Sequence, residues 1–210
     1  MMNRRQFALL GSAGLLSRYL TAYTGRPSSL IHKNQERHSP LTAYGPTRAT
    51  TGANAIIYPS GDLAWANPGA VTGTSGYANI TMRLRGLSQA LQCGGFNFNI
   101  PANAGISGVE VTANILNTME PNPPFGYLYV ELWNSVTGYI SNQSFNKTAS
   151  ETSTVIPMTF GGPQDRWDAN ITPSQVNGSD FYVLFLAYCG NYNNHGQAEI
   201  NDVVVTIYTG

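Results

Sequence analysis

The chain has 210 residues, and its 11 basic and 11 acidic residues give a formal net charge of zero. Charged residues make up 10%, against about 25% in an average soluble domain. Aromatic residues reach 11%, and there are 22 glycines and 12 prolines. This composition excludes a disordered chain and favours an all-β protein over helices rich in Glu, Lys and Leu. Because the charges cancel, we expect no nucleic-acid partner.

The charges are distributed unevenly along the chain. Residues 1–50 hold seven basic residues and one acidic residue, which gives 7 − 1 = +6. The remaining residues hold four basic and ten acidic residues, which gives 4 − 10 = −6. This asymmetry predicts a basic leader or arm followed by a mildly acidic body.

Residues 1–22 have the features of an export leader. Arg4 and Arg5 are followed by Phe7 and by a short Gly/Ala-rich apolar run that ends at Leu16. A paired arginine before such a run is typical of a twin-arginine signal, although a Sec-type signal or an amphipathic helix is also consistent with it. The run is about half as long as a membrane span. We therefore expect an extracellular or cell-surface protein with no membrane span in its mature form.

Residues 23–60 are rich in Gly, Pro, Ser, Thr and Arg and show no hydrophobic period, which is typical of a linker or an extended arm. One short stretch is an exception. Ala55, Ile56, Ile57 and Tyr58 form an apolar run that Pro59 closes. We interpret this run as a strand that stands before the body begins.

Residues 61–210 show repeated alternation of apolar and polar residues with period two, separated by Gly-, Pro- and Asn-rich turns. The runs that predict strands are 80–84, 96–100, 109–115, 127–133, 181–188 and 200–208. We predict a single jelly-roll-like two-sheet β-sandwich, all-β, with an extended N-terminal arm. The side chains assigned to its core are Trp65, Phe96, Phe98, Ile100, Val109, Val111, Val183, Phe185, Val205 and Ile207.

Three segments of the body carry a recognisable pattern: Trp65-Ala66-Asn67-Pro68, Gly95-Phe96-Asn97-Phe98-Asn99-Ile100-Pro101 and Ile106-Ser107-Gly108-Val109-Glu110-Val111. This pattern resembles the W-x-N-P / G-F-x-F-x-I-P β-sandwich modules of phage tail and fibre proteins and of secreted prokaryotic surface or filament proteins. The resemblance covers about residues 62–208. It implies a virion or extracellular structural role and no known chemistry.

Sequence motifs for catalysis, phosphate binding, zinc binding and dinucleotide binding are missing from the sequence. Asp165 and Asp168 bracket Trp167 and have the chemistry to bind calcium, but a turn in which Asp caps backbone N–H groups is the favoured interpretation. We therefore expect no enzyme activity, no cofactor and no metal ion.

Cys93 and Cys189 are the only cysteines. Cys93 precedes one predicted strand and Cys189 closes another, so antiparallel neighbours would bring them together. In an exported protein this arrangement predicts a disulfide between Cys93 and Cys189. Two separate buried thiols remain the alternative.

Two functions fit these features. The first is a structural subunit of an extracellular filament or surface assembly, a homopolymer in which residues 55–58 of the arm pair with the next copy as a donor strand. The alternative is a glycan- or receptor-binding module whose ligand contacts aromatic side chains. The candidate ligand aromatics are Trp133, Tyr139, Tyr188 and Tyr192. A viral capsid jelly roll with a nucleic-acid-binding arm is disfavoured, because residues 1–50 carry too little charge.

Overall fold

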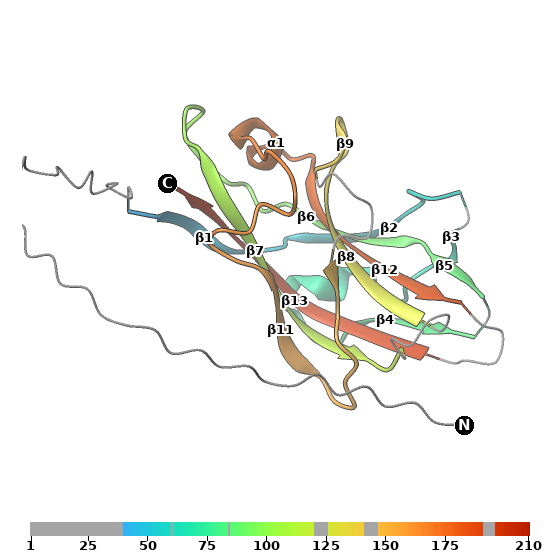
Figure 1. The fold of residues 1–210 in the computed structure, drawn as a ribbon. Helices are drawn as coiled ribbons and strands as arrows, with labels where there is room; N and C mark the ends of the chain where they lie inside the picture. The colour runs from blue at the N-terminus through green and yellow to red at the C-terminus, as the bar shows by residue number, and fades with distance from the viewer. Residues whose placement is uncertain (1–39, 60, 84, 120–125, 141–146, 191–195) are drawn as a thin grey trace, which may run out of the picture. The chain divides into compact units, whose positions relative to one another are not determined.

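The computed structural model describes residues 40–210 except 60, 84, 120–125, 141–146 and 191–195 (Figure 1). Residues 38–210 form a compact unit of their own. The predicted leader, residues 1–22, lies outside the described residues. Within the described part, thirteen strands form two sheets, with one turn of 3-10 helix and one short α-helix. This confirms the prediction of an all-β, jelly-roll-like two-sheet sandwich. No helix in the described part is long and apolar enough to cross a membrane.

Sheet A has five strands, all antiparallel to their partners. Its path runs β1, β13, β7, β11, and β4 pairs with the half of β13 that β1 leaves uncovered. The bounds are β1 Thr42–Arg48, β4 Ala78–Met82, β7 Ile106–Asn117, β11 Ile156–Gly161 and β13 Gly196–Thr209.

Sheet B has eight strands built around the pair β8 and β12 (Figure 1). The short strands β9 and β10 border β8, while β6 and β5 follow each other along the far side of β12. Farther out, β2 pairs with β6, and β3 pairs in parallel with β5. The bounds are β2 Thr51–Ala55, β3 Gly61–Leu63, β5 Gly86–Ser88, β6 Ala90–Gly94, β8 Gly126–Asn134, β9 Gly138–Tyr139, β10 Lys147–Thr148 and β12 Phe181–Cys189.

The six strands β6, β7, β8, β11, β12 and β13 explain why the core is continuous. Strands β6, β8 and β12 belong to sheet B, and strands β7, β11 and β13 belong to sheet A. Side chains alternate between the two faces along each of these strands, so each strand turns one face toward the opposite sheet. The two inner faces form one core cluster. All ten side chains predicted for the core are buried, which confirms their assignment.

The segment 96–100 differs from the prediction in one respect. Its side chains alternate between buried and exposed as expected, but it is not a strand, because β6 ends at Gly94. Gly95 and Asn97 both have positive φ values, 76° and 51°, which take the backbone out of the sheet geometry. Phe96 and Phe98 instead stack on each other at 6.1 Å between ring centroids and pack against Phe181.

The predicted arm, residues 23–60, extends too far along the chain. Residues 23–39 lie outside the described part, but β1 and β2 are edge strands of the two sheets of their own chain. The chain crosses from one sheet to the other at Ala49, which is buried. The predicted strand at 55–58 is also shifted, since β2 ends at Ala55 and Ile56 is 71% exposed. The sandwich therefore begins near residue 42 and not at residue 61.

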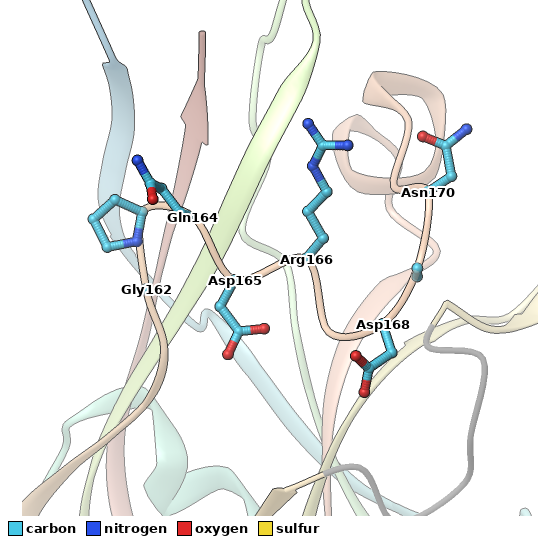
Figure 2. A pocket seen from close by; sticks show the side chains of 8 residues that line it. Gly162, Gln164, Asp165, Arg166, Asp168 and Asn170 are labelled. Carbon is cyan, nitrogen blue, oxygen red and sulfur yellow. The ribbon is translucent and has the colours of Figure 1, made fainter. Parts of the chain in front are cut away.

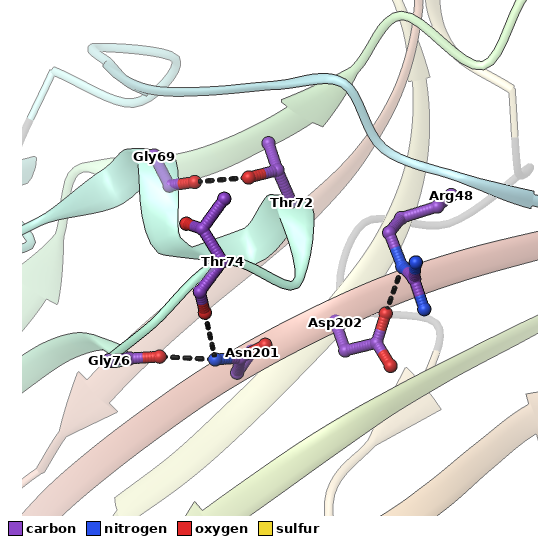
Figure 3. A network of polar contacts seen from close by, with 7 residues as sticks. All are labelled: Arg48, Gly69, Thr72, Thr74, Gly76, Asn201 and Asp202. Atoms are coloured by element: carbon purple, nitrogen blue, oxygen red, sulfur yellow. Dashed lines mark hydrogen bonds and ion pairs between the residues drawn. The ribbon is translucent and has the colours of Figure 1, made fainter.

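The junction between β1 and β2 is held by polar contacts to β13 (Figure 3). The Arg48 guanidinium pairs with the Asp202 carboxylate at a bulge of β13, where Asp202 has a φ of 56°. The neighbouring Asn201 donates from Nδ2 to the Thr74 carbonyl at 3.1 Å and also to the carbonyl of Gly76. These contacts join the start of the sandwich to the loop after the 3-10 helix η1, Pro68–Thr72.

The predicted disulfide between Cys93 and Cys189 is wrong in this structure, which holds both residues as buried thiols. Cys93 lies opposite Val183 of β12, whereas Cys189 is the last residue of β12 and lies opposite Gly86 and Gly126. Six positions along a strand correspond to about 20 Å. A disulfide requires Cα atoms within about 7 Å. The reason for the error is that β12 extends beyond β6 and pairs its C-terminal end with β5.

Candidate ligand-binding face

The outer face of sheet B carries a concentration of aromatic side chains. Along β8, every second side chain points away from the core, and the inward neighbours Leu128, Val130 and Leu132 are fully buried. The adjacent strand β12 follows the same alternation. We use the term aromatic face for the outward residues of these strands and the side chains packed on them: Tyr58, Tyr127, Tyr129, Glu131, Trp133, Tyr139, Tyr182, Leu184, Leu186 and Tyr188.

The register of β8 and β12 sorts the aromatic side chains into two groups. Trp133 lies opposite Tyr182, and Tyr139 of β9 lies on the other side of Trp133; these three form the first aromatic group. Tyr127 lies opposite Tyr188. With Tyr129, this pair forms the second aromatic group. Tyr127 and Trp133 are six positions apart on one strand, so the two groups are separated by about 20 Å.

The first aromatic group is set by the β8–β9 hairpin and by a glycine. The rings of Trp133 and Tyr139 meet edge to face, with 4.8 Å between centroids and an interplanar angle of 88°. On the other side, the ring of Tyr182 lies directly over Gly94 of β6, where a Cβ atom would come within 2.5 Å of the ring. A side chain at position 94 would displace Tyr182, so the glycine determines how this ring lies.

The second aromatic group consists of tyrosines alone. Tyr127 and Tyr129 stack at 5.3 Å with an interplanar angle of 27°. Burial, followed by the neighbouring Tyr127 and Tyr188, raises the pKa of Tyr129 to about 12. All three tyrosines are partly exposed. A tyrosine hydroxyl has both hydrogen-bond donor and acceptor capacity, so this group offers polar as well as apolar surface.

A polar centre lies between the two groups. Glu131 is fully buried although it points outward, and it lies opposite Leu184. The Tyr58 hydroxyl reaches this carboxylate, with its Oη atom 3.3 Å and 3.4 Å from the two Glu131 oxygens. The Tyr58 ring is 6.1 Å from that of Tyr139. Burial raises the pKa of Tyr58, and its hydrogen bond with Tyr139 and the Glu131 charge raise it further.

Tyr58 belongs to the segment that follows β2, and this segment covers the middle of the face. Ile57 and Tyr58 pack against the cluster formed by Ala90, Leu184 and Leu186. The two leucines are fully buried even though they point away from the core. A stretch that we expected to leave the body therefore packs on this surface and covers its middle.

The outer face of sheet A has a different chemistry. Along β7 the outward side chains include Glu110, Thr112 and Asn114, which alternate with buried apolar residues. Thr159 of β11 lies opposite Thr112. Within the described strands, the concentration of aromatic side chains is thus a property of sheet B and not a general consequence of composition.

The loop 162–170 forms an open hollow, on which Figure 2 shows Arg166 pointing one way and the carboxylates of Asp165 and Asp168 the other. Asp165 accepts hydrogen bonds from the Trp167 backbone N–H at 2.8 Å and from the Lys147 ammonium at 2.5 Å. Burial alone would raise the pKa of Asp165, but these two donors lower it. The turn interpretation of Asp165 fits these contacts. No group of three metal-ligating side chains occurs among the described residues.

The structure brings three of the four predicted ligand aromatics to one face. Trp133 and Tyr139 are in direct contact, and Tyr188 lies in the second group, whereas Tyr192 lies outside the described residues. The sequence analysis missed Tyr58, Tyr127, Tyr129, Glu131 and Tyr182. The alternation Tyr-x-Tyr-x-Glu-x-Trp at 127–133 and the Tyr at each end of 182–188 are the signals that would have found most of them.

No family model and no curated protein matches the chain. Among solved structures, it is similar to a xylan-binding module, CBM15, with 9% identity and a TM-score of 0.36 over 80% of this chain and 96% of the module. It is also similar to the apo form of a cyclase from Fischerella sp., with 11% identity and a TM-score of 0.30 over 80% of this chain and 96% of the cyclase. These likenesses are too distant to assign a function. The fold and the face by themselves define a β-sandwich with an aromatic sheet surface.

Proposed function

We propose that the chain is an exported glycan-binding β-sandwich module and that its ligand lies on the aromatic face. The observation that supports this proposal is the placement of six partly exposed aromatic rings on two adjacent central strands and the β9 hairpin. Sugars have apolar C–H faces and a rim of hydroxyl groups. Aromatic rings cover the former, while tyrosine hydroxyls and carboxylates satisfy the latter.

The surroundings of the face support the same chemistry. Gln92 of β6 lies opposite Leu184, points outward and is partly exposed. The Glu131 carboxylate holds Tyr58 in place from below. A ring of hydrogen-bonding groups around apolar rings is the pattern that orients a polar ligand, because unpaired polar groups are costly once water is excluded.

The test uses the full chain and a panel of insoluble and soluble polysaccharides in retention assays. Trp133→Ala removes the largest ring of the face and should weaken binding about tenfold, equivalent to about 1.4 kcal/mol. Tyr77→Ala is the matched control, because Tyr77 is 38% exposed and lies outside the aromatic face. The proposal fails if the wild-type chain binds none of the panel, or if both variants bind as tightly as the wild type.

A second candidate function is the filament subunit, and residues 42–58 favour it. This stretch supplies an edge strand to each sheet, its Ile57 and Tyr58 pack on Leu184 and Leu186, and Pro59 follows it directly. The same pairings made by the corresponding segment of a neighbouring copy would join subunits into a homopolymer. Light scattering of the native exported protein tests this. A concentration-independent monomer would contradict it, whereas fibres or large particles would support it.

A further inference from the structure

We propose that the aromatic face takes an internal stretch of a linear, uncharged glycan, which lies along β8 and β12 and touches both aromatic groups. This inference rests on the proposed function and adds the class of ligand to it. The alternatives are a single sugar or chain end held at one group, and an acidic polysaccharide.

The first argument is the length of the face. Trp133 and Tyr182 form one cross-strand pair, and Tyr127 and Tyr188 form another, six positions away on both strands. The distance of about 20 Å between the pairs exceeds the size of one sugar ring. Two ring pairs at this spacing along one sheet face suit a chain that continues past both ends.

The second argument is the connection between the two groups. Between the pairs lie Leu184 and Leu186, which are fully buried, and Gln92 of β6 lies opposite Leu184. Ala53 of β2 lies opposite Gln92. Ile57 and Tyr58 pack over the two leucines, and the partly exposed Tyr58 ring lies 6.1 Å from that of Tyr139. Aromatic surface therefore continues from the first group into the middle of the face, where a chain held at one group would pass on its way to the other.

The third argument is charge. Glu131 is the charged residue at the outward positions of β8 and β12, and no Lys, Arg or His occupies an outward position on β2, β6, β8 or β12. Arg85 stands beyond this region, just before β5. A carboxylate in a water-poor layer interacts strongly with other charges. Like charges facing it are unfavourable, which disfavours uronic-acid chains.

The experiment is calorimetry of the full chain with cello-, xylo- and manno-oligosaccharides from the disaccharide to the octasaccharide. In the series that binds, affinity should rise by about tenfold or more once the chain reaches both groups, because the second contact becomes intramolecular. Trp133→Ala and Tyr188→Ala should each abolish this rise, whereas Tyr77→Ala should keep it. Trp133→Phe retains a ring and should keep most of it, which separates loss of contact from loss of folding.

The possible outcomes separate this inference from the proposed function. Equal affinity for short and long oligosaccharides, or a length dependence that survives both alanine variants, overturns the extended-chain assignment while glycan binding stands. Binding of polygalacturonate as tight as that of the best neutral polymer overturns the uncharged assignment. Absence of binding to every glycan overturns the proposed function, and this inference fails with it.

Discussion

The substitution Gly52→Ala tests whether β2 is part of the sandwich. A Cβ atom at this position would lie 2.1 Å from the Pro68 carbonyl oxygen and 2.6 Å from the Val71 Cγ2 atom. The oxygen is a backbone atom of η1 and cannot rotate away, so either β2 or η1 must shift. Inserting atoms into a packed contact of this kind costs about 1–3 kcal/mol. The entropic benefit of replacing glycine, about 0.4–1 kcal/mol, opposes this effect and is smaller.

Gly69→Ala is the matched control, because it lies in η1 itself and a Cβ atom there meets nothing within 4 Å. Its unfolding free energy should stay within about 0.5 kcal/mol of the wild type. Urea denaturation followed by circular dichroism measures both variants. A Gly52→Ala chain with the wild-type midpoint would refute the packing of β2 on η1 and would restore the free arm that the sequence suggested. If the midpoint depends on protein concentration, the contact is made between copies.

Two further predictions concern the cysteines and the loop at Asp165. The denatured, unreduced protein should titrate two thiols per chain. In the native protein Cys93 should stay unreactive, because burial raises its pKa. If no thiol titrates after denaturation, the two cysteines are bridged. Lys147 and the Trp167 N–H lower the pKa of Asp165, so this carboxylate stabilises the fold above about pH 4 and loses that effect as the pH falls. Asp165→Asn should therefore be less stable than the wild type at about pH 7, with a smaller difference at about pH 3 in urea titrations; an unchanged difference would contradict this account.

The sequence predicted the sandwich because long central strands have a strong hydrophobic period. In β7 and β13, buried Val109, Val111, Val205 and Ile207 alternate with more exposed residues, and this pattern is sufficient to assign the inner face. The edge strand β1 gives no such signal. None of its seven residues is buried, and five are exposed, so no position demands an apolar side chain. A strand held mainly by backbone pairing leaves little trace in composition, so residues 42–48 had the sequence features of an arm.

The disulfide and the binding face depend on register, which the sequence does not contain. Nothing in the sequence shows that β12 exchanges partners from β6 to β5, and this exchange separates Cys93 from Cys189. The run 127–133 is apolar on nearly both faces and predicted a strand covered on both sides. Only the pairing of β8 with β12 shows that Trp133 meets Tyr182 and that Tyr127 meets Tyr188 on the uncovered side.

The position of the aromatic groups on two central strands has a consequence for how such a surface can change. Strand pitch, rather than loop conformation, sets the interval between Trp133 and Tyr127, since both belong to β8. Removal of one residue between them would move every side chain on one side of the deletion to the opposite face of the sheet. An aromatic ring that now points outward would then point into the core. Variants of this surface can therefore exchange one ring for another. They cannot change the distance between the two aromatic groups by one residue at a time, because each such step would turn outward side chains inward.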